Sequence, residues 1–134
     1  DVIRILNDAL EREMGAIVQF LHHSFLVFGP HRRPIQDWLR GRAMKSHAHA
    51  IVLGEKITAL GGHPSAEVHI EHGPGEQSMR EMLQEDLALE RQVLQLYVDS
   101  LALLRDDVGL DHLFRQIVLE RQGQVEEFEK LLRS

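Results

Sequence analysis

The sequence predicts an all-α fold, a four-helix bundle with one long crossover between its second and third helices. Three observations lead to this prediction. Apolar residues recur every three or four positions over long stretches, glycine and proline gather at few places, and no stretch alternates with the period of two that is typical of strands. A chain of 134 residues buries one core, so residues 1–134 are expected to form a single domain.

The breaks define four helical segments. They cover approximately residues 1–28, 34–60, 78–104 and 110–133. Pro34 suits the first turn of the second helix, where its missing N–H would have no helical partner. Ser78 is a candidate N-cap of the third helix, because Glu81 follows it at the spacing of a capping box.

The long connection GGHPSAEVHIEHGPGEQS decides the topology. At ~3.3 Å per extended residue, about 17 residues can run the length of a helix of about 40 Å. Such a crossover makes the second and third helices parallel, and we expect them to be neighbours. The short turns GPHRRP and RDDVG then join the first helix to the second and the third to the fourth as antiparallel hairpins.

The apolar stripe of each helix is interrupted near its midpoint by polar residues. They are Glu13 in the first helix, Ser46 and His49 in the second, Glu90 in the third, and Arg121 and Gln124 in the fourth. The midpoints of four helices of similar length meet at one level of a bundle. We therefore expect carboxylates, an imidazole, a hydroxyl, a guanidinium and an amide to share one buried layer.

Two interpretations of this layer are open from the residues alone. Glu13, His49 and Glu90 form a set of one imidazole and two carboxylates, which suits a divalent metal such as iron, zinc or manganese. Alternatively, Arg121 neutralises the two carboxylates without a metal, because a buried carboxylate is costly unless a cation pairs with it.

Four stretches resemble bacterioferritin, within the ferritin-like superfamily. They are LNDALEREMGAIVQFLHH, HAIVLGEKITALGGHPS, EDLALE and ERQGQVEEFEKLL, and the resemblance covers essentially the whole chain. In this family a Glu from the first and third helices and a Glu-x-x-His from the second and fourth face inward and bind two metal ions. The resemblance implies that Glu13, His49 and Glu90 occupy metal-ligand positions.

Three of the ligand positions that the resemblance implies carry other residues. Ser46 stands in place of a bridging Glu, and Arg121 and Gln124 stand in place of the second Glu-x-x-His. A di-iron centre needs these carboxylates, so ferroxidase activity is not expected. The resemblance thus implies an iron-related protein whose reduced site holds one divalent metal or none. The alternative is a non-catalytic structural or partner-binding subunit whose former site is closed by salt bridges of Arg121.

His47 faces away from the predicted layer, because it lies two positions from His49 and such residues point about 200° apart on a helix. The resemblance places His47 where bacterioferritins carry a haem-ligating Met at a two-fold dimer interface, which implies a haem shared by two copies. The alternative is a surface or interface histidine without a ligand. His22 and His23 lie off the stripe of Glu13 and have weaker claims to a site.

The amino-acid composition argues against some classes of binding partner. The formal net charge of −6 argues against nucleic-acid binding, and no apolar run is long enough to span a membrane. The chain has no Cys, which excludes disulfides and thiolate metal sites, and a cytoplasmic location is the default expectation. The resemblance implies a homodimer or a larger homo-oligomer.

Overall fold

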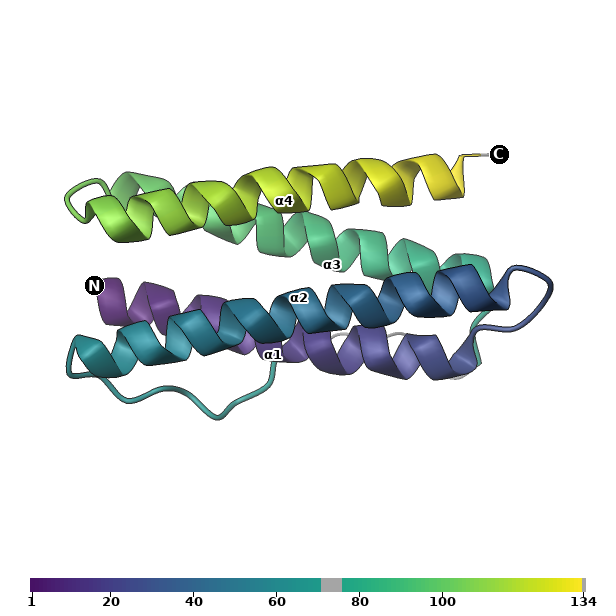
Figure 1. Ribbon diagram of the computed structural model, residues 1–134, viewed down its shortest axis with the longest axis horizontal. Helices are drawn as coiled ribbons and strands as arrows, with labels where there is room; N and C mark the ends of the chain where they lie inside the picture. Colours follow the sequence, from purple (N-terminus) through teal and green to yellow (C-terminus); the bar gives the residue numbers. More distant parts are fainter. Residues whose placement is uncertain (71–75, 134) are drawn as a thin grey trace.

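The computed structural model describes residues 1–70 and 76–133, and every regular element within them is helical. Four long helices lie along a common axis (Figure 1). They are α1 (Val2–Leu26), α2 (Arg32–Ala59), α3 (Met79–Ser100) and α4 (Val108–Leu132), and the short 3₁₀ helix η1 (Leu101–Leu103) follows α3. The predicted all-α four-helix bundle is confirmed. None of the helices described is long and apolar enough to cross a membrane.

Side-chain caps explain where α1, α3 and α4 begin. The Asp1 carboxylate accepts a hydrogen bond from a backbone N–H in the first turn of α1. Ser78 and Glu81 form the predicted capping box at the start of α3. Asp107 caps α4 in the same way as Asp1 caps α1, so α4 begins slightly earlier than predicted. The third helix is shorter than predicted, because the chain tightens into η1.

The hairpins form as predicted, but one predicted neighbour relation is wrong. α1 packs on α2 and α3 on α4, and α2 and α3 run in the same direction (Figure 1). However, α3 packs against α1 rather than against α2. The described part of the crossover is also bound to α1. Asn7 Nδ2 donates to the His63 carbonyl at 3.2 Å, and the Ser65 N–H donates to Asn7 Oδ1 at 2.8 Å.

Gly15 allows the crossover to lie directly on α1. A Cβ atom at this position would stand 1.8 Å from the carbonyl oxygen of His69, far inside van der Waals contact. One turn earlier on α1, Glu11 Oε2 accepts a hydrogen bond of 2.7 Å from the Ser65 hydroxyl. Glycine is therefore required here for close backbone approach.

Most of the core on both sides of the central polar level is apolar. The fully buried apolar side chains include Leu6, Phe20, Leu39, Leu53, Phe114 and Phe128. Removing such a side chain from water contributes about 1.5–3 kcal/mol. This apolar frame fixes the level at which the polar side chains of the four helices meet.

Candidate functional site

A layer of polar side chains crosses the middle of the bundle. This polar layer consists of Glu13 on α1, Arg42, Ser46 and His49 on α2, Glu90 and Tyr97 on α3, and Glu120 and Arg121 on α4. Glu13, Ser46, Glu90 and Arg121 have no exposed surface. The structure thus brings together the midpoint residues that the sequence singled out, with the exception of Gln124.

Arg121 lies at the centre of the polar layer and contacts a residue of each other helix. Its Nη2 donates to Glu13 Oε1 and, at 3.3 Å, to Ser46 Oγ, while its Nη1 donates to Glu90 Oε1. Burial alone would lower the pKa of this guanidinium, but the two carboxylates outweigh burial and raise the pKa of Arg121. Arg121 is therefore a permanent cation that bridges Glu13 and Glu90.

Arg42 is a second buried cation, and sequence reasoning missed its role. Its Nη2 donates to Glu90 Oε2 at 2.9 Å, and its Nη1 donates to Glu120 Oε2 at 2.6 Å. Arg42 lies on the apolar stripe of α2 one turn before Ser46, which is the signal that could have found it. Glu90 is consequently held between two guanidiniums, those of Arg42 and Arg121.

Glu13 has two further polar neighbours. The Tyr97 hydroxyl donates to Glu13 Oε2 at 2.5 Å, and His49 Nδ1 lies 3.3 Å from the same oxygen. The His49 contact is electrostatic, because its geometry does not meet that of a hydrogen bond. Burial acts to raise the pKa of Glu13, but Arg121 and these two neighbours together lower it. Glu13 therefore stays ionised, and Tyr97 is a second residue of the layer that sequence reasoning missed.

In this arrangement the polar layer does not fit a divalent metal ion. Both carboxylate oxygens of Glu13 and both of Glu90 already accept hydrogen bonds, and the Arg121 guanidinium stands between the two carboxylates. Within residues 1–70 and 76–133, no group of three or more His, Asp or Glu side chains is placed to hold a metal ion. The metal set Glu13, His49 and Glu90 requires Arg121 to move, and it stays a prediction.

Gln124 is turned away from the polar layer. Its Oε1 accepts a hydrogen bond of 3.1 Å from Trp38 Nε1. The indole ring in turn packs on Phe128, with ring centroids 4.3 Å apart. The amide at this implied ligand position is thus engaged by α2 at the edge of the core.

His47 is exposed on the outer side of α2, away from the polar layer. Met44 and Ile51, about one turn to either side, expose 65% and 54% of their surfaces. Met44 and Ile51 give His47 exposed apolar neighbours on α2, and its role as a haem ligand stays a prediction.

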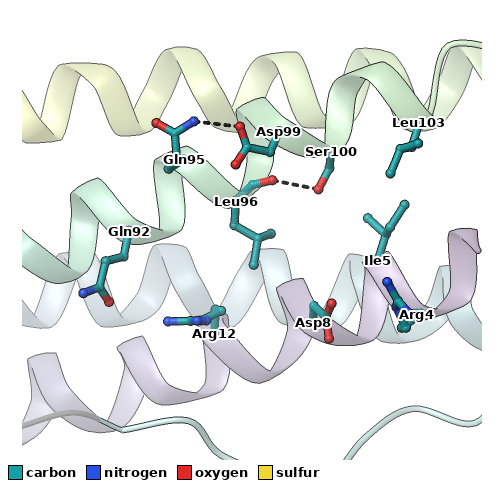
Figure 2. Close-up of a pocket in the computed structure, with 10 residues that line it drawn as sticks. All are labelled: Arg4, Ile5, Asp8, Arg12, Gln92, Gln95, Leu96, Asp99, Ser100 and Leu103. Carbon is teal, nitrogen blue, oxygen red and sulfur yellow. Dashed lines mark hydrogen bonds between the residues drawn. The ribbon is translucent and has the colours of Figure 1, made fainter.

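Two surface cavities lie outside the polar layer. Figure 2 shows the larger one, of about 590 Å³, between α1 and α3. Arg4, Asp8 and Arg12 follow one another at one-turn spacing along its α1 rim, so the charge alternates there. On the α3 rim, Gln95 Nε2 donates to Asp99 Oδ1 at 2.7 Å (Figure 2). No residue of the polar layer lines either cavity.

Comparison with known proteins identifies the family. Residues 3–134 match the Ferritin family, described as a ferritin-like domain. The chain belongs to this family. The resemblance to ferritin-like proteins that the sequence indicated is confirmed over essentially its whole length.

The similar proteins include bacterioferritins. A bacterioferritin from Mycolicibacterium paratuberculosis is 28% identical over 134 residues, which cover 98% of this chain and 84% of the relative. A Rhodobacter capsulatus bacterioferritin, described with a metal-free dinuclear site and haem iron, superposes with a TM-score of 0.82 at 27% identity, over 98% and 82% of the two chains. A ferritin-like di-iron-carboxylate protein from Bacillus anthracis, at 24% identity, shares the fold, with a TM-score of 0.91 over 98% and 95% of the chains.

Proposed function

We propose that this chain is a ferritin-like subunit that assembles with further copies of itself and contains no working di-iron centre. The observation that carries the proposal is the Arg121 guanidinium between Glu13 and Glu90. A guanidinium keeps its charge at any pH that the fold tolerates, so it neutralises the two carboxylates without a metal. The role of the subunit is then structural within an iron-related assembly, rather than oxidation of iron.

A mononuclear metal site at Glu13, His49 and Glu90 is the competing proposal. It requires Arg121 to leave both carboxylates and to find new acceptors in a closely packed interior. Breaking one partner away from a buried ion pair costs about 3–5 kcal/mol, which a bound metal has to exceed. The two proposals differ in whether the protein takes up iron.

Iron uptake and oxygen consumption test the proposal. The purified protein is incubated with ferrous iron without oxygen, desalted and analysed for metal, and oxygen consumption is then followed with fresh ferrous iron. We expect no stoichiometric iron and no consumption above that of buffer. About one iron per chain, lost in Glu90→Ala, would instead support the mononuclear site and overturn the closed-site proposal.

A rebuilt ligand set gives the positive comparison. The triple variant Ser46→Glu, Arg121→Glu, Gln124→His restores the side chains that the family resemblance implies, and we expect it to bind iron. The matched control is Arg115→Glu with Gln116→His, two exposed positions on the same helix. We expect the control to behave like the wild type, because its new side chains face solvent.

We also infer that His47 is a candidate haem ligand at an interface between two copies. Its exposed position beside Met44 and Ile51 offers an imidazole within an apolar surface. One chain supplies one imidazole, so a two-fold axis is needed to place two of them on one haem iron. The haem would supply electron transfer, while the protein positions the imidazoles and excludes water.

Haem binding is tested by expressing the protein with a haem supply and recording the absorption spectrum with the molar mass in solution. The expected result is a Soret band in a dimer or larger species, lost in His47→Ala and kept in His22→Ala. A wild-type protein without the band, or a band that survives His47→Ala, contradicts this assignment.

A further inference from the structure

A second buried cluster of charged residues lies between α1 and α3, apart from the polar layer. His23 is 1% exposed and Asp86 is fully buried. His23 Nδ1 lies 2.7 Å from Asp86 Oδ1, and His23 Nε2 lies 3.4 Å from Glu85 Oε1. Both ring nitrogens of one imidazole therefore face carboxylate oxygens.

This geometry identifies the charge state that the cluster requires. A neutral imidazole has a single N–H, so one of its nitrogens would direct a lone pair at a carboxylate. The imidazolium has two N–H groups, so it donates a hydrogen bond to Asp86 Oδ1 and makes a longer ion pair with Glu85. Gln19 Nε2 also donates to Asp86 Oδ1, at 3.0 Å, which leaves Asp86 Oδ2 without a hydrogen-bond partner among the described residues.

We propose that His23, Glu85 and Asp86 form a proton-operated latch that fastens the first turns of α3 to α1. When His23 binds a proton, the latch closes through two ion pairs. When His23 releases the proton, Asp86 faces a neutral ring inside the bundle and the attraction between the helices is lost.

The latch also reaches the segment that leads into α3. Gln77 Nε2 donates to Glu85 Oε2 at 2.6 Å, so the carboxylate that pairs with His23 also holds the chain just before the helix. Release of the latch is therefore expected to loosen the entry to α3 before any other part of the bundle.

A cavity gives protons access to the buried ring. It has a volume of about 230 Å³ and is lined by Val18, Gln19, His22, His23 and Ile70. His22 is exposed, so water reaches the cavity beside His23. The buried latch can therefore exchange protons with solvent.

The other charged groups described near the latch do not replace His23 as the cation that faces Asp86. On α1, the ring of His22 has its centroid 6.1 Å from that of His23. On α3, Glu81 lies one turn before Glu85 and is bound to the cap residue of the helix. From α2, Arg40 Nε donates to Ser24 Oγ at 3.2 Å. Among the described residues, no charged side chain of α2 or α4 pairs with His23 or Asp86.

The titration of His23 supports the latch. Burial acts to lower the pKa of His23, but Asp86 and Glu85 outweigh burial and raise it above the ordinary value of 6.5. A group whose pKa is raised on folding stabilises the fold below its unfolded pKa and loses this effect as the pH rises through the folded value. The latch is accordingly closed in mildly acidic solution and opens on the alkaline side of 6.5.

Nuclear magnetic resonance on the wild-type protein tests the latch directly. The ring protons of His22 and His23 are titrated from about pH 5 to about pH 9, and amide exchange in the first turns of α3 is followed on the same sample. We expect His23 to titrate above the ordinary histidine value of 6.5. The amide exchange rate, corrected for its intrinsic pH dependence, should rise by about tenfold as the pH increases through the His23 midpoint. The reason is that loss of the His23 proton opens the latch.

Variants separate the latch from general stability. His23→Gln should exchange fast at every pH and show no midpoint, whereas the neighbouring control His22→Gln should keep the wild-type profile. If His23→Gln does not fold, the His23 titration and the amide exchange of the wild-type protein test the latch without this variant. The latch is refuted if His23 titrates at or below the ordinary value of 6.5, or if exchange in α3 is unchanged through the His23 midpoint.

Discussion

The polar layer and the His23 latch bury carboxylates between the same two helices but neutralise them with different cations. In the polar layer, Glu13 on α1 and Glu90 on α3 share the guanidinium of Arg121. In the latch, Asp86 pairs with the imidazole of His23. A guanidinium keeps its proton under all conditions in which the protein is folded, and an imidazole does not. The choice of cation decides which contact responds to pH.

The carboxylates themselves show why a cation is needed in both places. Burial raises the pKa of Glu90 and of Asp86 above their ordinary values, although the neighbouring cations oppose this effect. Each carboxylate would thus take up a proton more readily if its cation were removed. The comparison predicts a graded series of effects on stability.

Arg121→Met is expected to have the largest effect. The substitution leaves Glu13 and Glu90 buried without the cation that bridges them, while Met roughly keeps the volume. The free energy of unfolding should fall by about 3–5 kcal/mol, as for other buried ion pairs that lose one partner. Urea unfolding at neutral pH measures this change.

The matched control is Arg115→Met on the same helix. Arg115 pairs with Asp111 at 3.0 Å, but 63% of its side chain is exposed. An exposed pair of this kind contributes between about 0 and 1 kcal/mol. Equal losses in the two variants would show that Arg121 does not hold the polar layer together.

Removing the carboxylates should rescue most of the loss caused by Arg121→Met. In the double variant Glu13→Gln with Glu90→Gln, neutral amides replace the two carboxylates that pair with Arg121. Replacing Arg121 by Met in this variant therefore leaves neither of these two side chains as a buried anion. We expect the cost of Arg121→Met to fall to below about half of its original value. A cost that does not change in this background would mean that packing, not charge, makes Arg121 necessary.

Asp86→Asn should have an intermediate effect that depends on pH. The variant keeps the size of the side chain but removes the charge that faces His23. At about pH 6 the free energy of unfolding should fall by about 1.5–3 kcal/mol, the range for a hydrogen bond to a charged group. At about pH 9 the loss should be smaller, because His23 gives up its proton as the pH rises through its raised pKa. Equal losses at both pH values would place the effect outside the His23 contact.

The periodicity of the sequence was sufficient to predict the four helices and the level of the polar layer. Glu13, Ser46, Glu90 and Arg121 interrupt otherwise apolar stripes, and in a bundle of equal helices such interruptions have to meet. The same stripes contain Arg42 and Tyr97. Their contacts could not be predicted, because long side chains reach across the core to partners that depend on rotamers and helix spacing.

The His23 latch could not be predicted because it depends on which helices are neighbours. The sequence led us to expect α3 beside α2, whereas the crossover is bound along α1 and α3 packs there. Only this arrangement brings Asp86 to His23. The apolar stripe that contains Glu13 also gave no reason to select His23, because the His23 side chain lies on a different face of α1.

Removal of divalent metal should have the smallest effect of all. A metal held at 100 times its dissociation constant stabilises a fold by about 2.7 kcal/mol, and chelation removes that gain. In this chain the Arg121 guanidinium already neutralises Glu13 and Glu90, so EDTA should leave the unfolding curve unchanged. The triple variant Ser46→Glu, Arg121→Glu, Gln124→His provides the contrast, because its stability should depend on added ferrous iron. If EDTA destabilises the wild type by kcal/mol amounts and Glu90→Ala removes that sensitivity, a metal rather than Arg121 balances the polar layer.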